Sequence, residues 1–199
     1  MGAVGEPAHA QDRCEAGQAC ATDFTTLDLR AALGMFATGV TIVTAENDGE
    51  RIGATVSSFN SVSLDPPLVL FSVGRNAKAF AAWNSVKRFA INVLDQSQRD
   101  LSSRFGRAQG DKWLGVETLR GEASGAALLP GALAWFECET HQIFDGGDHI
   151  IILGRVLTLA RHGGEAAQPL VFFGGSYRNL DARTRVEPLP SEHWWIYAW

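Results

Sequence analysis

Short apolar segments of strand length recur along this chain, and turn residues separate them. Asn47-Asp48-Gly49 and the DGGD run at residues 145–148 join neighbouring segments and favour β-hairpin turns. Gly154 interrupts the apolar run after the second turn. The segments occupy residues 39–45, 51–56, 68–73, 89–94, 132–144, 149–159 and 170–173. Many short strands joined by hairpins predict a mainly β fold, an antiparallel β-barrel with peripheral helices.

Three helices are expected at the periphery. Residues 26–36 carry apolar side chains at helical spacing, with Thr25 or Thr26 as the N-cap. Asn76 is the expected cap of a short helix ending at Trp83. Asp95 is the expected cap of a helix over residues 96–105, before Gly106. Residues 108–131 are predicted to form loops around Trp113 and Leu114.

Length and composition limit the possible classes of protein. The 199 residues fit one domain, predicted over residues 25–182 between a mobile tail (1–24) and an aromatic extension (183–199). A net charge of -5 with scattered Lys and Arg predicts no nucleic-acid partner, and no apolar run reaches the roughly 18 residues of a membrane helix. Three cysteines favour a reducing, cytoplasmic setting. No metal site is expected, because His9 does not complete a four-ligand set with Cys14 and Cys20.

The stretch RIGATVSSFNSVSLDPP, residues 51–67, combines strand-forming residues with features of a ligand site. Its small residues would let a planar ligand approach the backbone, and its hydroxyls can donate hydrogen bonds to ring or phosphate oxygens. The alternative is a Ser-rich loop between two strands. On its residues alone, the stretch does not separate the two interpretations.

Several motifs in a fixed order resemble those of the short-chain flavin reductase family. They are GVTIVTA (39–45), PLVLFSV (67–73), FAINVL (89–94), GGDHIIILGRV (146–156) and PLVFFGGSY (169–177). The similarity runs from about Leu27 to Leu180. These proteins are the reductase components of two-component flavin monooxygenases. The resemblance implies an FMN-binding split barrel, a homodimer, FAD or FMN as flavin, NADH or NADPH as hydride donor, and a partner monooxygenase.

The resemblance also implies site residues. Lys78, Ser103 and Arg104 would lie near the flavin phosphate, although Arg104 can equally be a solvated helix end. The flavin contacts implied are Arg51, Ile52, Gly53, Ala54, Thr55, Ser57, Ser58, Ser72, Val73, Gly74, Lys78, Ser103 and Arg104. The implied NAD(P)H contacts are His149, Phe172, Phe173, Gly174 and Tyr177.

His149 is the residue to which the resemblance gives a role in the reaction. In the family the Gly-Asp-His trio lies beside the nicotinamide, where an imidazole can hold the ring over the flavin; the alternative is a solvated histidine at a hairpin turn. Hydride passes directly from the dihydronicotinamide to the flavin and needs no protein acid. No G-x-G-x-x-G motif opens a strand-to-helix turn, so no Rossmann unit is expected. Arg155 and Arg178 are candidates to bind a 2'-phosphate.

The leading hypothesis is an NAD(P)H:flavin oxidoreductase, of the EC 1.5.1 type, that supplies diffusible reduced flavin to a separate monooxygenase. Two alternatives remain. The same barrel can hold flavin for electron transfer or storage without reductase turnover. A flavin-free interaction protein that uses the aromatic C-terminus would leave the hydroxyl-rich stretch unexplained.

Overall fold

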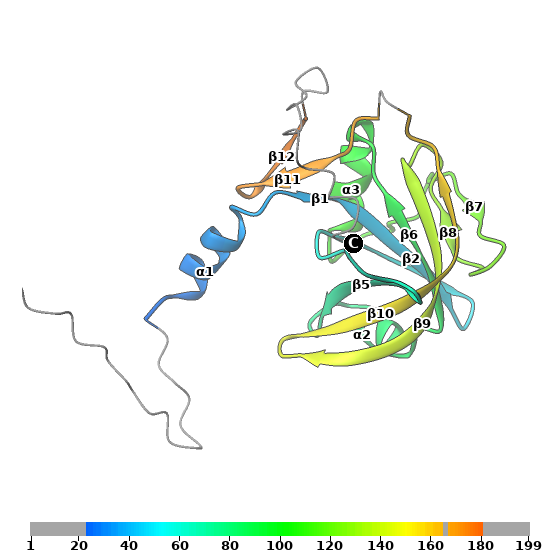
Figure 1. Ribbon diagram of the computed structural model, residues 1–199, viewed down its shortest axis with the longest axis horizontal. Helices are drawn as coiled ribbons and strands as arrows, with labels where there is room; N and C mark the ends of the chain where they lie inside the picture. Colours follow the sequence, from blue (N-terminus) through cyan, green and yellow to red (C-terminus); the bar gives the residue numbers. More distant parts are fainter. Residues whose placement is uncertain (1–22, 165–166, 181–199) are drawn as a thin grey trace, which may run out of the picture.

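The computed structural model describes residues 23–164 and 167–180 (Figure 1). The expectations for the N-terminal tail, with Cys14 and Cys20, and for the aromatic C-terminal extension lie outside these residues. Within them, no helix is both long and apolar enough to cross a bilayer. The same residues contain no group of three or more His, Cys, Asp or Glu side chains arranged to hold a metal ion.

A seven-stranded antiparallel sheet forms the body of the molecule. Its order is β3-β2-β6-β9-β10-β5-β4. The strands are β2 (Thr41–Asn47), β3 (Glu50–Val56), β4 (Asn60–Leu64), β5 (Pro67–Gly74), β6 (Arg88–Val93), β9 (Ala134–Gly146) and β10 (His149–Arg161). The sheet curls until edge strand β3 lies near β5, but no ladder joins them. The predicted mainly β split barrel is confirmed, and the gap between β3 and β5 is its split.

An arm projects from the barrel (Figure 1). It consists of helix α1 (Thr26–Leu33) and a small sheet of β1 (Thr38–Gly39), β11 (Val171–Phe173) and β12 (Ser176–Arg178). The predicted Thr25 cap is confirmed, because its side chain accepts a hydrogen bond from the Asp28 N–H. The helix ends at Leu33, however, rather than at Phe36, and none of its residues is buried.

The predictions for the other two helices are each partly correct. Helix α2 (Phe80–Ser85) starts after Ala79, so Asn76 does not cap it. Asp95 is the N-cap of the next helical segment, as predicted. The first turn of that segment is the 3-10 helix η1 (Gln96–Gln98), and the α-helix α3 (Arg99–Phe105) follows it. The predicted loop region also contains two short paired strands, β7 (Leu119–Arg120) and β8 (Ala127–Leu128).

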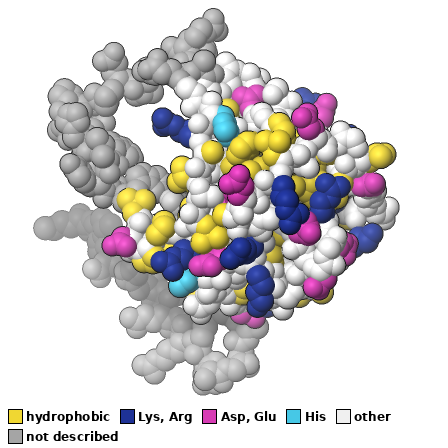
Figure 2. Space-filling model, turned by 90° about the vertical axis from the view of Figure 1, so that its right-hand side faces the viewer, with side chains coloured by type: hydrophobic (Ala, Val, Ile, Leu, Met, Phe, Trp, Pro, Cys, Tyr) yellow, Lys and Arg dark blue, Asp and Glu magenta, His cyan; other side chains and the backbone are white. Residues whose placement is uncertain are grey.

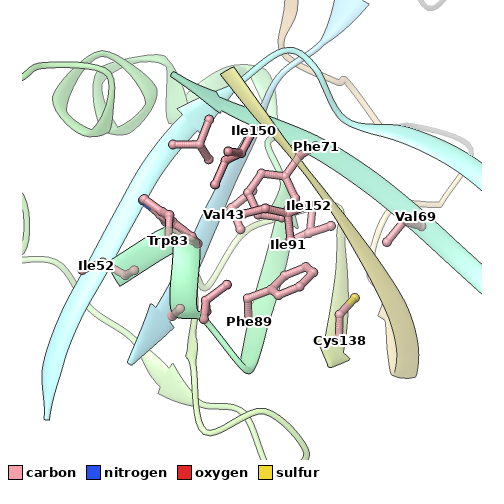
Figure 3. Close-up of a cluster of buried hydrophobic side chains, with 13 residues drawn as sticks. Val43, Ile52, Val69, Phe71, Trp83, Phe89, Ile91, Cys138, Ile150 and Ile152 are labelled. Carbon is pink, nitrogen blue, oxygen red and sulfur yellow. The ribbon is translucent and has the colours of Figure 1, made fainter. Parts of the chain in front are cut away.

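The main hydrophobic core fills the interior of the barrel (Figure 3). Phe71 from β5 makes edge contacts with Phe89 from β6 and with Trp83, which α2 inserts from one side. Gly154 lies where β10 passes Phe89, and a Cβ there would come within 2.3 Å of the Phe89 ring. The ladder shifts register between Leu153 and Gly154. The glycine interrupts the apolar run because the core leaves no room for a side chain.

A second core lies on the other face of β2. Val43 faces the barrel interior, whereas Ile42 packs with Phe105 of α3 and with Leu170. Because both faces of β2 are covered, its sequence is apolar without strict alternation. This second core fixes α3 beside β3, and thereby one side of the split.

The outer surface carries charges of both signs. On the face shown in Figure 2, Lys and Arg side chains are interspersed with Asp and Glu and with small apolar patches. A mixed surface of this kind produces no strong field of one sign.

Candidate functional site

A cavity of about 840 Å³ lies in the split between β3 and the end of β5. Most of residues 77–83, in the α2 region, and most of residues 105–113 form its other walls, and His149 lines it from the hairpin of β9 and β10. Its volume is within the roughly 300–1,000 Å³ of small-molecule sites.

The cavity brings together most of the residues expected to bind flavin, and His149. Those that line it are Arg51, Ile52, Gly53, Ala54, Thr55, Ser57, Ser58, Ser72, Val73, Gly74, Lys78 and His149. Those that do not line it are Ser103, Arg104, Phe172, Phe173, Gly174 and Tyr177. One wall of this cavity is thus formed by residues 51–58 of the hydroxyl-rich stretch, and that stretch is two strands, β3 and β4, joined by a turn rather than only a loop.

The edge of β3 offers backbone groups to this cavity. The carbonyl of Arg51 accepts a hydrogen bond from Trp113 Nε1 at 3.1 Å, and that of Gly53 accepts one from Lys112 Nζ at 3.2 Å. Both carbonyls therefore point away from β2. Since the N–H and C=O of one residue point to the same side of an antiparallel strand, the Gly53 N–H also faces the split, as a donor for a ligand.

Gly53 is small for a different reason from the one expected. A Cβ at this position would meet the Phe105 ring at 2.5 Å and Trp113 at 3.1 Å. Phe105 and Trp113 make an edge contact with centroids 4.8 Å apart. The space beside Gly53 is thus filled by protein rings, and the glycine allows α3 and the following loop to close one wall of the cavity.

Two of the hydroxyls in the stretch hold the walls together. Thr55 Oγ1 donates to the Ser102 carbonyl of α3 at 2.7 Å, and Ser58 Oγ accepts from the Ser72 N–H of β5 at 2.9 Å. Ser57, by contrast, is exposed and makes no side-chain hydrogen bond to the described residues. Ser57 is consequently the hydroxyl of this wall that is free to bind a ligand.

Two lysines give the cavity a basic end. Lys112 Nζ donates to the carbonyls of Gly53 and Phe105, at 3.2 and 2.9 Å, and Lys78 lines the same cavity. Burial, and secondarily the charge of Lys78, lowers the pKa of Lys112. Neither lysine forms a salt bridge with any described residue. The backbone carbonyls that accept from Lys112 do not neutralise its positive charge. The two lysines therefore favour binding of an anion, such as a phosphate, in this part of the cavity.

Lys112 was not predicted from the sequence. It lies in the region that is predicted to form loops, residues 108–131. The sequence signal that could identify it is its position beside Trp113, one of the two apolar residues of that region. Asp111 accepts a hydrogen bond from the Trp113 N–H and the Arg51 guanidinium lies 4.7 Å from the Trp113 ring centroid. These contacts hold the loop, and with it Lys112, against β3.

Arg104 and Ser103 occupy different positions from the lysines. Arg104 Nη1 donates to the Leu114 carbonyl at 2.8 Å and lines an adjoining recess of about 250 Å³ with Arg107 and Lys112. Ser103 lines neither space. The phosphate role expected for them stays a prediction, and Lys112 is better placed for it.

His149 stands beside the C-terminal end of β5, at the edge of the same cavity. It pairs with Gly74 across the β10–β5 ladder, and its Nδ1 lies 2.7 Å from Asp148 Oδ1. The hydrogen bond with His149, and then its charge, lowers the pKa of the Asp148 carboxyl. Nδ1 is engaged, whereas Nε2 makes no hydrogen bond to the described residues and would lie 3.5 Å from a Cβ built on Gly74. His149 thus presents one ring nitrogen at the cavity.

The aromatic residues expected beside the nicotinamide lie elsewhere in the chain's fold. Phe172 and Tyr177 pack against one another and against the second core. Tyr177 Oη lies 2.8 Å from Ser102 Oγ. In Figure 1, β11 and β12 are at the end of the molecule away from the turn that carries His149. Their nicotinamide role stays a prediction.

Comparison with known proteins identifies the family. The flavin reductase like domain matches residues 33–181. HsaB of Mycobacterium tuberculosis, the reductase subunit of a flavin-dependent monooxygenase, is 34% identical over 165 residues, which are 83% of this chain and 86% of that protein. SmoA of Agrobacterium fabrum, an FMN reductase (NADH), is 45% identical over 151 residues, covering 74% of this chain and 82% of SmoA.

A solved structure is similar as well. The NADH:FAD oxidoreductase SgcE6 of Streptomyces globisporus, in complex with NAD and FAD fragments, superposes with a TM-score of 0.71 at 40% identity, covering 81% of this chain and 93% of SgcE6. The motifs, the split barrel and the length of these matches agree, and this chain belongs to the flavin reductase like domain family.

Proposed function

We propose that this protein is a flavin reductase that oxidises NADH or NADPH and reduces FAD or FMN. The observation that carries the proposal is that one cavity in the split brings together the open edge of β3, His149 and two lysines that form no salt bridge with the described residues. The similar proteins SmoA, an FMN reductase (NADH), and SgcE6, an NADH:FAD oxidoreductase, support both the reaction and its two reactants, a dihydronicotinamide and a flavin.

The residues present fit a flavin. Lys78 and Lys112 would hold the phosphate-bearing tail, and the Gly53 N–H and Ser57 hydroxyl would donate to the polar edge of the ring system. His149 would position the nicotinamide through Nε2, while Asp148 fixes its ring orientation through Nδ1. When bound, the flavin supplies the hydride acceptor itself, so the protein has only to bind, orient and exclude water.

We further propose that the flavin is exchangeable. Cys138, the cysteine within the described residues, is fully buried. Burial, with a smaller contribution from Glu137, raises the pKa of its thiol to about 12. It therefore forms no accessible thiolate for covalent attachment. Denaturation is expected to release all the flavin into the supernatant.

The decisive experiment incubates the purified protein with NADH and free flavin under air. Steady NADH oxidation that depends on added flavin supports the reductase. A protein that binds flavin and stays yellow without consuming NADH is a passive carrier. Absence of flavin binding would refute both and favour an interaction protein.

The proposal includes a monooxygenase that accepts the reduced flavin, because HsaB is the reductase subunit of such a system. It also includes a cytoplasmic homodimer, and the exposed apolar side chains of the arm, Leu27, Leu33, Met35 and Phe36, support the dimer. Light scattering of the intact protein tests this, and Leu33→Glu should reduce the mass to that of a monomer.

A further inference from the structure

The turn that carries His149 has little packing of its own. The Asp148 side chain is 94% exposed and that of His149 is 47% exposed. Gly147 adopts a φ of +76°, and its N–H donates to Asp145 Oδ1 of the same hairpin. An exposed hairpin turn of this kind moves readily unless another element holds it.

Arg75, in the turn that follows β5, makes three contacts with this hairpin. Its Nε donates to the Gly147 carbonyl at 2.8 Å, and its Nη2 lies 2.8 Å from Asp145 Oδ2. Its backbone N–H donates to the Asp148 carbonyl at 2.9 Å. The guanidinium also lies 5.8 Å from the centroid of the Phe80 ring in α2. Arg75 thus joins the hairpin turn to the element that forms the cavity wall.

We propose that Arg75 is a positioning residue for hydride transfer, acting through His149; this inference rests on the function proposed above. Arg75 adjoins Gly74, the residue opposite His149 in the ladder. Fixing residues 145–148 against β5 therefore fixes the direction in which His149 Nε2 meets the nicotinamide. A planar guanidinium can bond a carbonyl and a carboxylate at once, whereas a lysine ammonium lacks this fixed fork.

An exposed ion pair alone contributes little to stability, so Arg75 should affect geometry more than folding. Arg75→Ala should slow reduction of bound flavin at saturating NADH about tenfold, because a small misplacement of a reacting group lowers the rate steeply. Flavin affinity should change less than about twofold, since Arg75 does not line the cavity. Arg75→Lys should recover little of the loss.

The test is a cycle of variants measured by stopped-flow flavin reduction. Parent, Arg75→Ala, His149→Ala and the double variant are compared, with Arg161→Ala as control. Arg161 is exposed on β10 and makes no salt bridge or side-chain hydrogen bond with the described residues. If Arg75 acts through His149, its removal slows the parent but has no further effect in the His149→Ala background. Equal slowing in both backgrounds would overturn the proposal, as would a rate within about twofold of the parent.

Two further measurements separate the possible failures. If Arg75→Ala lowers the melting temperature well below that of Arg161→Ala, Asp145→Asn replaces it in the cycle. Asn keeps an oxygen for the Gly147 N–H but removes the carboxylate that faces Arg75. Amide hydrogen exchange of residues 145–149 tests the contact without any turnover, and should accelerate in Arg75→Ala but not in the control. A parent protein that reduces no flavin refutes the proposed function. Unchanged amide exchange of residues 145–149 in Arg75→Ala refutes the proposal that Arg75 holds this hairpin turn in place.

Discussion

Two parts of the cavity lining are built in different ways. At the basic end, Lys112 is half-buried and bonds two carbonyls, and Phe105 and Trp113 close on Gly53. His149, by contrast, lies at the exposed end of the β9–β10 hairpin, which polar contacts to Arg75 hold. The packed part suits a binding contact that is equal in ground and transition states, whereas at the hairpin the position of one side chain decides the rate and depends on the contacts that fix it. Substitutions in the two parts should therefore separate affinity from turnover.

The largest effect is expected at the exposed end. His149→Ala should slow hydride transfer to bound flavin about 100-fold, because the nicotinamide loses its positioning contact. Flavin affinity and melting temperature should stay close to those of the parent, since His149 has little packing. Stopped-flow reduction measures the rate, and flavin titration serves as the control. A rate within about twofold of the parent would make His149 a solvated turn residue and favour a passive carrier.

The next effect is expected at the basic end. Lys112→Met should weaken flavin binding about 10- to 100-fold, since a charged hydrogen bond contributes roughly 1.5–3 kcal/mol. Turnover at saturating flavin should be nearly unchanged. Arg104→Met is the matched control: the sequence predicted a phosphate contact there, but Arg104 bonds the Leu114 carbonyl in the adjoining recess. Equal losses in the two variants, measured by flavin titration, would contradict a specific role of Lys112 and would mean either that Arg104 also contacts the phosphate or that both cations act as a diffuse field.

Packing at the basic end can be tested without changing a charge. Gly53→Ala places a methyl group against Phe105 and should destabilise the fold by about 1–3 kcal/mol, with weaker flavin binding as the wall shifts. Gly39→Ala is the control, because a Cβ there meets nothing within 4 Å. Thermal unfolding of both variants measures the difference. A Gly53→Ala variant as stable as Gly39→Ala would mean that α3 and the wall adjust freely.

The smallest effect is a pH dependence of flavin affinity. A bound phosphate favours protonated Lys112, whose pKa burial and Lys78 lower in the free protein. Flavin affinity should therefore be highest at neutral pH, where Lys112 is protonated. It should fall as the pH rises toward the pKa of Lys112, which lies below the ordinary lysine value of 10.5. Isothermal titration at several pH values measures it. Lys112→Arg keeps its charge and should remove the fall; if the fall persists, it belongs to another group.

The sequence alone determined six of the seven strands of the main sheet, the Asp48-Gly49 turn and the two confirmed helix caps, because these depend on local backbone chemistry. It did not predict β4, whose residues 60–64 are mostly polar and exposed. The family motifs also located the β3 and β5 walls and His149. These residues are close in space because β10 pairs with β5 and the curl of the sheet brings edge strand β3 near β5.

Only the tertiary structure decided which of the remaining residues belong to the cavity. Lys112 enters it because Phe105 and Trp113 pack on Gly53, from which they are 52 and 60 positions away in the sequence. Tyr177 is directed to Ser102 by the second core rather than to the hairpin turn. Arg75 reaches Asp145 across 70 positions of sequence. Local propensity describes each segment well, but long-range packing determines which side chains meet, and no single stretch of sequence contains that information.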